Sequence, residues 1–181
     1  TENDFAIAEE VTIKGIHKKR PDIVLYINGI AVGAGGIVLK TINGGATWQS
    51  QNSGTTIWLL GIYFVDNQLG WAVGSNGLIL KTNNGGVTWQ SQPSGTNKQL
   101  EGVHFIDSQT GWIIGEGGTI LKTNNGGSTW QQLASPANYE VFDVHFVDSQ
   151  IGWVVGSYGQ IMKTINGGTN WQVQSSGTQS F

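Results

Sequence analysis

The chain has 181 residues, 38% of them hydrophobic, and a formal net charge of −3 at pH 7. That length suits one buried domain or one repeat array, and the weak charge gives no reason to expect binding to nucleic acid or insertion into a membrane. With 28 glycines, 8 tryptophans and no cysteine, the composition favours short strands joined by tight turns and excludes disulfides and thiolate metal sites. No apolar run reaches the length of a membrane span and no signal peptide is visible. The sequence therefore predicts a soluble protein of unknown compartment.

A repeat of 41 residues organises most of the chain. One tryptophan series recurs at this interval, at Trp48, Trp89, Trp130 and Trp171. A second series comprises Trp71, Trp112 and Trp153, and the same step back from Trp71 reaches Ile30. Constant spacing without insertions is the signature of a repeat architecture. We divide the chain into a leader, residues 1–17, and four copies at residues 18–58, 59–99, 100–140 and 141–181.

The leader and the start of the first copy do not follow the repeat. Residues 5–13 alternate apolar and polar side chains, so they could add a strand to an exposed sheet edge or to a neighbouring chain. Residues 22–27 are predicted to be the first strand of the first copy. The basic cluster at residues 17–20 is interpreted as a solvated loop, because the other copies offer few cations.

Residues 4–33 resemble part of the N-terminal nuclease domain of type I restriction endonuclease subunits. Pro21 and Asp22 match the first half of that family's Pro-Asp and acid-x-Lys signature. The second half is missing, because no acidic residue follows before Asp66. A nuclease of this kind needs clustered carboxylates to hold Mg²⁺, so the sequence predicts no nuclease activity. The two ancestries could meet in a fusion at residues 31–33, with the strand reused and the chemistry lost.

Each complete copy contains four short segments typical of strands. In the third copy they lie at residues 102–107, 112–114, 119–123 and 128–133, separated by turn residues rich in glycine and asparagine. Four strands of this length in 41 residues match one blade of a β-propeller. A solenoid of stacked sheets is the main alternative.

The segment from Thr82 to Trp89, Thr-Asn-Asn-Gly-Gly-Val-Thr-Trp, resembles the Asp-box (BNR) repeat, with asparagine at the acidic position. Together with residues 70–74 and 79–82 it makes the unit similar to repeats of the photosystem II assembly-factor family, over residues 29–181. The resemblance implies a structural turn between the third and fourth strands. An asparagine side chain that bonds the backbone and a glycine pair that supplies positive φ suit that role. The structural Asp-box residues are Thr41, Asn43, Gly45, Trp48, Thr82, Asn84, Gly86, Trp89, Thr123, Asn125, Gly127, Trp130, Thr164, Asn166, Gly168 and Trp171.

These features predict an all-β fold, a β-propeller of four 41-residue, four-stranded blades. The last copy is as apolar as the inner copies, and no polar capping repeat follows it. Its outer face must be covered, either in a closed four-bladed ring or in a larger ring shared between chains. We favour a homo-oligomer.

Several enzyme classes fail on the residues they need. Sialidases, which also carry Asp-boxes, use an arginine triad, but Arg20 is the only arginine. The recurrent Asp66, Asp107 and Asp148 occupy equivalent turns, so they suit backbone bonding better than glycoside hydrolysis. His104 and His145 would be two metal ligands without a third, which makes a poor site. We predict no catalytic residue, metal or cofactor.

Repeated lysines and variable loop residues are the remaining candidates for binding. Lysines precede every Asp-box, where they could attract an anion in a ring but are better explained by stems packed over tryptophan, at Lys40, Lys81, Lys122 and Lys163. Propeller ligands bind at loops, where copies differ. The predicted ligand or partner contacts are Trp58, Glu116, Tyr139 and Tyr158.

The favoured function is a non-catalytic protein-binding or assembly scaffold, with a protein or peptide partner, as the family resemblance implies. A multivalent glycan-binding lectin with tryptophan-lined pockets is one alternative, and a glycan array would distinguish it. A self-assembling structural array is another, and it predicts concentration-dependent polymers. The arginine patch that the resemblance associates with partner binding has no counterpart here, so the partner itself does not carry over.

Overall fold

The computed structural model describes residues 24–26, 30–43 and 45–177, which form sixteen strands in four antiparallel sheets. Sheet A contains β1 (Val24–Tyr26), β2 (Ile30–Gly33), β3 (Ile37–Lys40) and β4 (Gln49–Asn52). Sheet B contains β5 (Leu59–Phe64), β6 (Gly70–Gly74), β7 (Ile79–Thr82) and β8 (Gln90–Gln92). Sheet C contains β9 (Leu100–Phe105), β10 (Gly111–Gly115), β11 (Thr119–Thr123) and β12 (Gln131–Gln132). Sheet D contains β13 (Val141–Phe146), β14 (Gly152–Gly156), β15 (Ile161–Thr164) and β16 (Gln172–Gln174).

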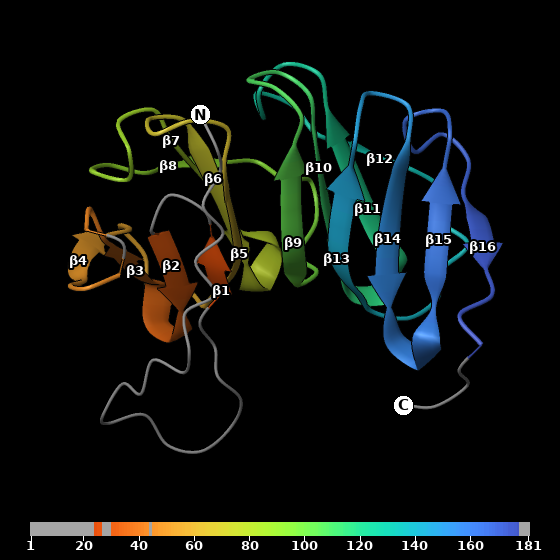
Figure 1. Cartoon of the computed structure of the whole chain (residues 1–181), viewed down its shortest axis with the longest axis horizontal. Coiled ribbons are helices and arrows are strands. Elements are labelled where there is room, and N and C mark those ends of the chain that lie inside the picture. The colour runs from red at the N-terminus through yellow and green to blue at the C-terminus, as the bar shows by residue number, and fades with distance from the viewer. Residues whose placement is uncertain (1–23, 27–29, 44, 178–181) are drawn as a thin grey trace.

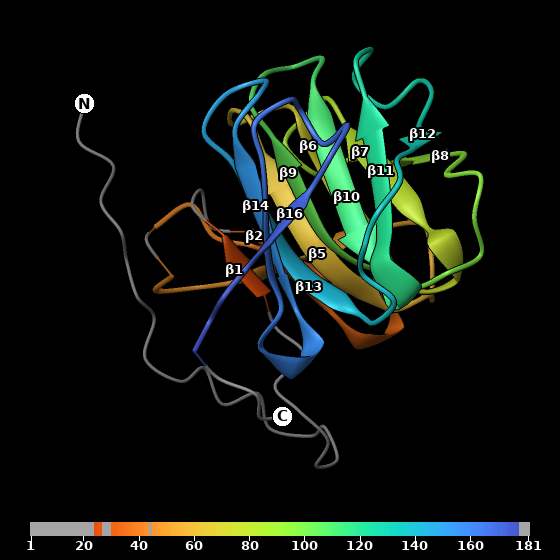
Figure 2. The same cartoon turned by 90° about the vertical axis from the view of Figure 1, so that its right-hand side faces the viewer.

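The four sheets follow one another along an arc, with sheets A and D at its opposite ends (Figure 1). Their first strands lie side by side, because β5 contacts β1 and β9, and β9 contacts β13. Viewed along the arc, the sheets stack behind one another (Figure 2). The described residues thus form propeller-like blades, but they do not close the four-bladed ring that the sequence allowed. No helix in the described part of the chain is both long and apolar enough to cross a membrane.

The predicted strands exist, with shifted bounds. The third strand of the third copy is β11 as expected, but the first begins two residues earlier, at Leu100, and the fourth shrinks to Gln131–Gln132. The glycine-rich link between the second and third strands is a single 3-10 turn in each sheet, at η1 (Ala34–Gly36), η2 (Ser75–Gly77), η3 (Glu116–Gly118) and η4 (Ser157–Gly159). The predicted leader strand at residues 5–13 and the basic cluster at residues 17–20 lie outside the described residues.

Sheet A differs from the others in its first hairpin. In sheet B the tryptophan position pairs with the residue eight before it, Trp71 with Tyr63, and the same holds in sheets C and D. In sheet A, Ile30 pairs instead with Tyr26, so β1 runs closer to β2 along the chain. The 41-residue spacing therefore stops setting the strand pairing before Ile30, where the sequence also departs from the repeat.

Apolar side chains between successive sheets form the cores. One face of sheet B, including Trp71, packs against the face of sheet C that carries Phe105, with the two rings stacked 3.5 Å apart. Trp112 and Phe146 stack in the same way, also at 3.5 Å, between sheets C and D. A Cβ atom on Gly111 would lie 2.5 Å from the Phe105 ring, so glycine opens the space that this ring fills. Each blade is therefore stabilised mainly by its neighbours.

Candidate functional site

The Asp-box turn between the third and fourth strands is held by side-chain bonds to its own backbone. In sheet C, the buried Thr123 hydroxyl accepts the Gly127 N–H at 2.9 Å and donates to Asn125 Oδ1 at 2.9 Å. Asn125 Oδ1 also accepts the N–H of Thr129 at 3.0 Å. The equivalent bonds recur in sheets A, B and D. The acceptor capacity of these asparagines is spent on the turn, which leaves the backbone carbonyls as its outward-facing polar groups.

Those carbonyls are held by the preceding sheet. Lys81 Nζ of sheet B donates to the Gly126 carbonyl of sheet C at 2.7 Å, and Trp71 Nε1 donates to the same oxygen at 3.3 Å. Lys81 Nζ also lies 5.3 Å from the centre of the Trp71 ring, within cation–π range. Burial lowers the pKa of Lys81, as expected for an ammonium group withdrawn from water. We call such a lysine and tryptophan pair a carbonyl clamp.

The clamp recurs between sheets C and D, where Lys122 and Trp112 both donate to the Gly167 carbonyl at 3.1 Å. Sheet A has Ile30 in place of the tryptophan, and Lys40 donates to the Gly85 carbonyl at 2.8 Å. The lysine stems thus do pack over tryptophan where one is present. These three ammonium groups join blades, which argues against a ring of lysines open to an anion.

A row of aromatic rings crosses the first strands of three sheets. Tyr63 of β5 lies 4.8 Å from His104 of β9, which lies 4.8 Å from His145 of β13, between ring centres. Burial, and then the charge of His145, lower the pKa of His104 to about 4. His104 is therefore neutral at pH 7. The two histidines are adjacent as their sequence positions suggest, but no cluster of three or more metal-ligating side chains exists among the described residues.

The recurrent aspartates serve the turn between the first and second strands. Asp148 Oδ1 accepts the N–H groups of Gln150 and Ile151, both at 2.7 Å. These backbone bonds, first from Ile151 and then from Gln150, lower the pKa of Asp148. The pKa of Asp66 is lowered by the same kind of bonds. Asp107 makes the equivalent bonds at 2.7 Å. The carboxylates are thus engaged singly, each in its own turn.

Two of the predicted contact residues come together. Tyr139, in the link between sheets C and D, and Tyr158, in η4, are 55% and 58% exposed, with ring centres 4.7 Å apart. They border a cavity of about 540 Å³ that is also lined by Val173 and Gln174 of β16 and by Gln160. We call this cavity the tyrosine pocket. The structure therefore brings the link and the hairpin turn into one site, although 19 positions separate Tyr139 from Tyr158.

Tyr158 adopts a backbone conformation that tyrosine rarely takes. Its φ is +58°, in the left-handed region, where the equivalent residues of the other sheets are Gly35, Asn76 and Gly117. Glycine and asparagine tolerate this region, whereas a bulky side chain costs about 1–2 kcal/mol there. The turn type thus comes from the repeat, and the tyrosine is held in it at a cost.

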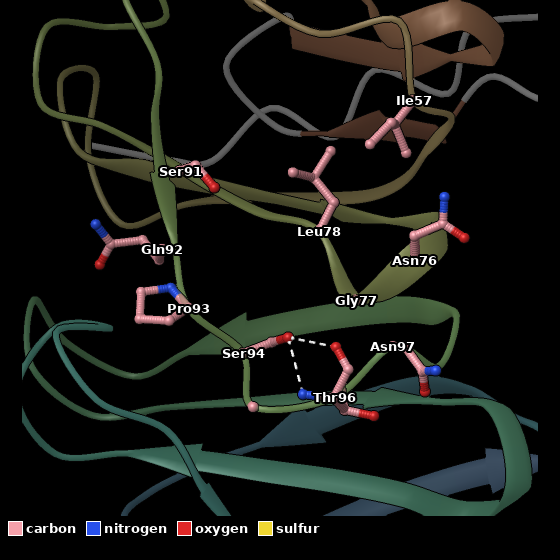
Figure 3. A pocket seen from close by; sticks show the side chains of 11 residues that line it. Ile57, Asn76, Gly77, Leu78, Ser91, Gln92, Pro93, Ser94, Thr96 and Asn97 are labelled. Atoms are coloured by element: carbon pink, nitrogen blue, oxygen red, sulfur yellow. Dashed lines mark hydrogen bonds between the residues drawn. The ribbon is translucent and has the colours of Figure 1, made fainter.

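Sheet B has the equivalent cavity with other side chains. There Ile57 and Asn76 replace the two tyrosines, and the volume is about 640 Å³. Figure 3 shows Leu78 beside Ile57, with Pro93 on the other side of the pocket and Ser94 bonded to the backbone of Thr96. In sheet C the pair is Lys98 and Gly117, with Lys98 Nζ close to the glycine. This pair of positions therefore varies from blade to blade over a constant turn. No tryptophan lines either of the two cavities.

The other two predicted contacts lie elsewhere. Glu116 is exposed at the start of η3, and its carboxylate accepts the N–H of Gln99 at 3.2 Å, within the preceding link. Trp58 is 52% exposed ahead of β5, and its carbonyl accepts the Ser75 N–H at 3.0 Å. Neither residue lines the tyrosine pocket.

Residues 46–138 and 129–180 match the family described as photosynthesis system II assembly factor YCF48. The chain belongs to the YCF48 family. Residues 1–34 match a second family, the type I restriction enzyme R protein N terminus. Sheet A is thus composite, since β1 and β2 lie within the second match and β4 within the first. This mixed origin fits the altered pairing of its first hairpin.

Solved structures agree with the YCF48 assignment. YCF48 bound to D1 peptide superposes with a TM-score of 0.64 at 28% identity, covering 71% of this chain and 44% of that one. YCF48 from Cyanidioschyzon merolae gives 0.63 at 30% identity, covering 71% and 43%. An ancestral GH74 enzyme gives 0.67 at 20% identity, covering 85% and 24%, which shows the fold alone. The chain spans less than half the length of both YCF48 structures. Among curated proteins, none matches it.

One residue of the tyrosine pocket was not predicted from the sequence. Val173 is exposed in β16, where the equivalent positions of the other YCF48-type repeats carry Ser50, Ser91 and Gln132. An apolar residue at an otherwise polar, outward-facing position was the available signal.

Proposed function

We propose that this chain is a non-catalytic scaffold that binds an extended peptide segment of a partner protein, with Tyr139 and Tyr158 as the contact. The observation that carries the proposal is the exposed pair of rings, one of which is held at positive φ. Tyrosine offers a large rigid surface and a hydroxyl, which makes it a frequent anchor in protein interfaces. Strained residues persist where function uses them, so the cost at Tyr158 supports a binding role.

The lining of the tyrosine pocket favours a peptide over a sugar. Val173 and the two rings supply apolar surface, while Gln160 and Gln174 supply amides that can pair with a peptide backbone. The lectin alternative required pockets lined by the repeated tryptophans, but Trp71 and Trp112 are buried between sheets. A peptide complex within the same family, YCF48 bound to D1 peptide, supports the same partner class.

The absence of catalysis is part of the proposal. Asp66, Asp107 and Asp148 each accept backbone N–H groups of their own turn. Carboxylates used in this way, one per blade, are not arranged as an acid and base pair across a substrate. The enzyme in the fold comparison shares only 20% identity with this chain, so its chemistry does not transfer.

The test replaces Tyr158 by glycine, the residue that sheet C carries at this position. A displayed library of random peptides is selected on the wild-type chain, and the affinity of the best binder is measured by calorimetry. We expect Tyr158→Gly to weaken binding at least tenfold, while the chain becomes more stable by up to about 1 kcal/mol because the strain is removed.

Asn76→Gly, the equivalent change in sheet B, is the matched control and should leave peptide affinity unchanged. Wild-type affinity in Tyr158→Gly would refute the proposed contact. Selection of no peptide, together with binding on a glycan array, would refute the peptide partner.

A further inference from the structure

The outer face of sheet D repeats the face that sheets B and C present to their neighbours, but nothing in the described structure covers it. Val155 is 41% exposed, whereas its equivalents Val73 and Ile114 are fully buried. Trp153 is half-buried, whereas Trp71 and Trp112 are fully buried. The face is apolar at its centre, so its exposure to water is unfavourable.

The carbonyl clamp of sheet D is assembled without its carbonyl. Lys163 Nζ lies 5.2 Å from the centre of the Trp153 ring, close to the 5.3 and 5.0 Å found in sheets B and C. Among the described residues, neither Lys163 Nζ nor Trp153 Nε1 makes a hydrogen bond to a backbone carbonyl. Both donors are therefore held in place for an acceptor that the described part of this chain does not supply.

The opposite end of the arc carries the complementary half. The Asp-box turn of sheet A keeps its internal bonds, with the Thr41 hydroxyl accepting the Gly45 N–H at 3.0 Å. Gly45 is only half-buried, whereas Gly127 and Gly168 are buried against the clamp tryptophan of the preceding sheet. Leu39 is also half-buried, whereas its equivalents, buried between sheets, are Leu80, Leu121 and Met162.

We infer that the outer face of sheet D binds sheet A of a second copy of this chain, with Trp153 and Lys163 clamping a backbone carbonyl of that copy's Asp-box turn. The geometry required is the one that joins sheet B to C and sheet C to D. Both halves are present on one molecule at opposite ends, so two copies meet head to tail. A cation and an indole N–H facing a carbonyl dipole give the contact its direction as well as its polarity.

The first experiment measures mass against concentration by sedimentation equilibrium. The wild-type chain should exceed its 19.4 kDa monomer mass as concentration rises. Val155→Asp and Lys163→Glu should remain monomeric over the same range, with unchanged circular dichroism spectra. Ile165→Asp is the matched control, because Ile165 is 64% exposed on the outside of the Asp-box turn and away from this face. That variant should associate like the wild type.

The second experiment tests the head-to-tail direction. Leu39→Asp disables the sheet A half, and Val155→Asp disables the sheet D half. Each variant alone should be monomeric, and an equimolar mixture should form a dimer of twice the monomer mass, because each supplies the half that the other lacks.

A wild-type chain that stays monomeric at all concentrations would overturn the inference. So would association that survives both Val155→Asp and Lys163→Glu, or a mixture that fails to dimerise while the wild type associates. Peptide affinity at the tyrosine pocket should be unchanged in Lys163→Glu, so failure of the joint and failure of the peptide site are separately visible.

Discussion

Sheets C and D are built from almost the same sequence, yet equivalent side chains sit in different surroundings. Trp112 of sheet C is fully buried against Phe146 and bonded to the Gly167 carbonyl, whereas Trp153 of sheet D is half-buried. The internal bonds of the two Asp-box turns are the same. The repeat therefore specifies the blade and its turn, while the next blade decides whether the outer face is a core or a surface.

The largest expected difference follows from these two tryptophans. Trp112→Ala should lower the free energy of unfolding by about 3–5 kcal/mol, because it removes a buried ring and leaves a cavity between two sheets. Trp153→Ala should cost less than about 1 kcal/mol when the chain is monomeric, because much of the ring already faces water. Urea denaturation at low protein concentration measures both variants against the wild type.

Equal losses in these two variants would break the comparison, because they would show that the outer face of sheet D is covered within one chain. Raising the protein concentration should increase the cost of Trp153→Ala and leave that of Trp112→Ala unchanged.

A smaller, pH-dependent effect is expected at His104, which is buried between neighbours, in contrast to the exposed His145. Burial and the charge of His145 lower the pKa of His104 from 6.5 to about 4. Between these pH values the unfolded chain binds a proton that the folded chain does not, so the free energy of unfolding falls as pH drops through this window. The full loss is about 3 kcal/mol by pH 4.

The control for this prediction is His104→Tyr, which places in sheet C the residue that sheet B has at Tyr63. Denaturation at pH 7 and pH 4.5 should show a marked loss for the wild type and a reduced loss for the variant. Asp66 and Asp148 act in a lower range, because their pKa values are below the ordinary 3.8 and their stabilising bonds are lost only on further acidification. An unchanged loss in His104→Tyr would assign the pH effect to other groups.

Much of the fold could be predicted from the sequence because the period is constant. Tryptophans spaced by 41 residues, with the Asp-box at a fixed offset, place four strands in each of sheets B, C and D. Sheet A escaped this reasoning in part, because the pairing of Ile30 with Tyr26 depends on a hairpin outside the repeat. Whether the arc closes depends on contacts between distant sheets, which a local pattern does not encode.

The candidate site was predictable only as separate residues. Tyr139 and Tyr158 stood out because they depart from the repeat, but their contact requires the link to fold back over η4. Glu116 departs from the repeat equally and bonds its own link instead. Val173 was missed because a single valine in a strand is ordinary until its exposure is known.

The most direct test of the account measures hydrogen exchange at the indole N–H groups by NMR, on the dilute, monomeric chain. Trp71 and Trp112 donate to carbonyls of the next sheet at 3.3 and 3.1 Å, so their indole protons should exchange slowly. The indole proton of Trp153 should exchange quickly under the same conditions and become protected as the concentration rises. Slow exchange of Trp153 in the monomer would contradict the claim that the clamp of sheet D is completed only by another copy.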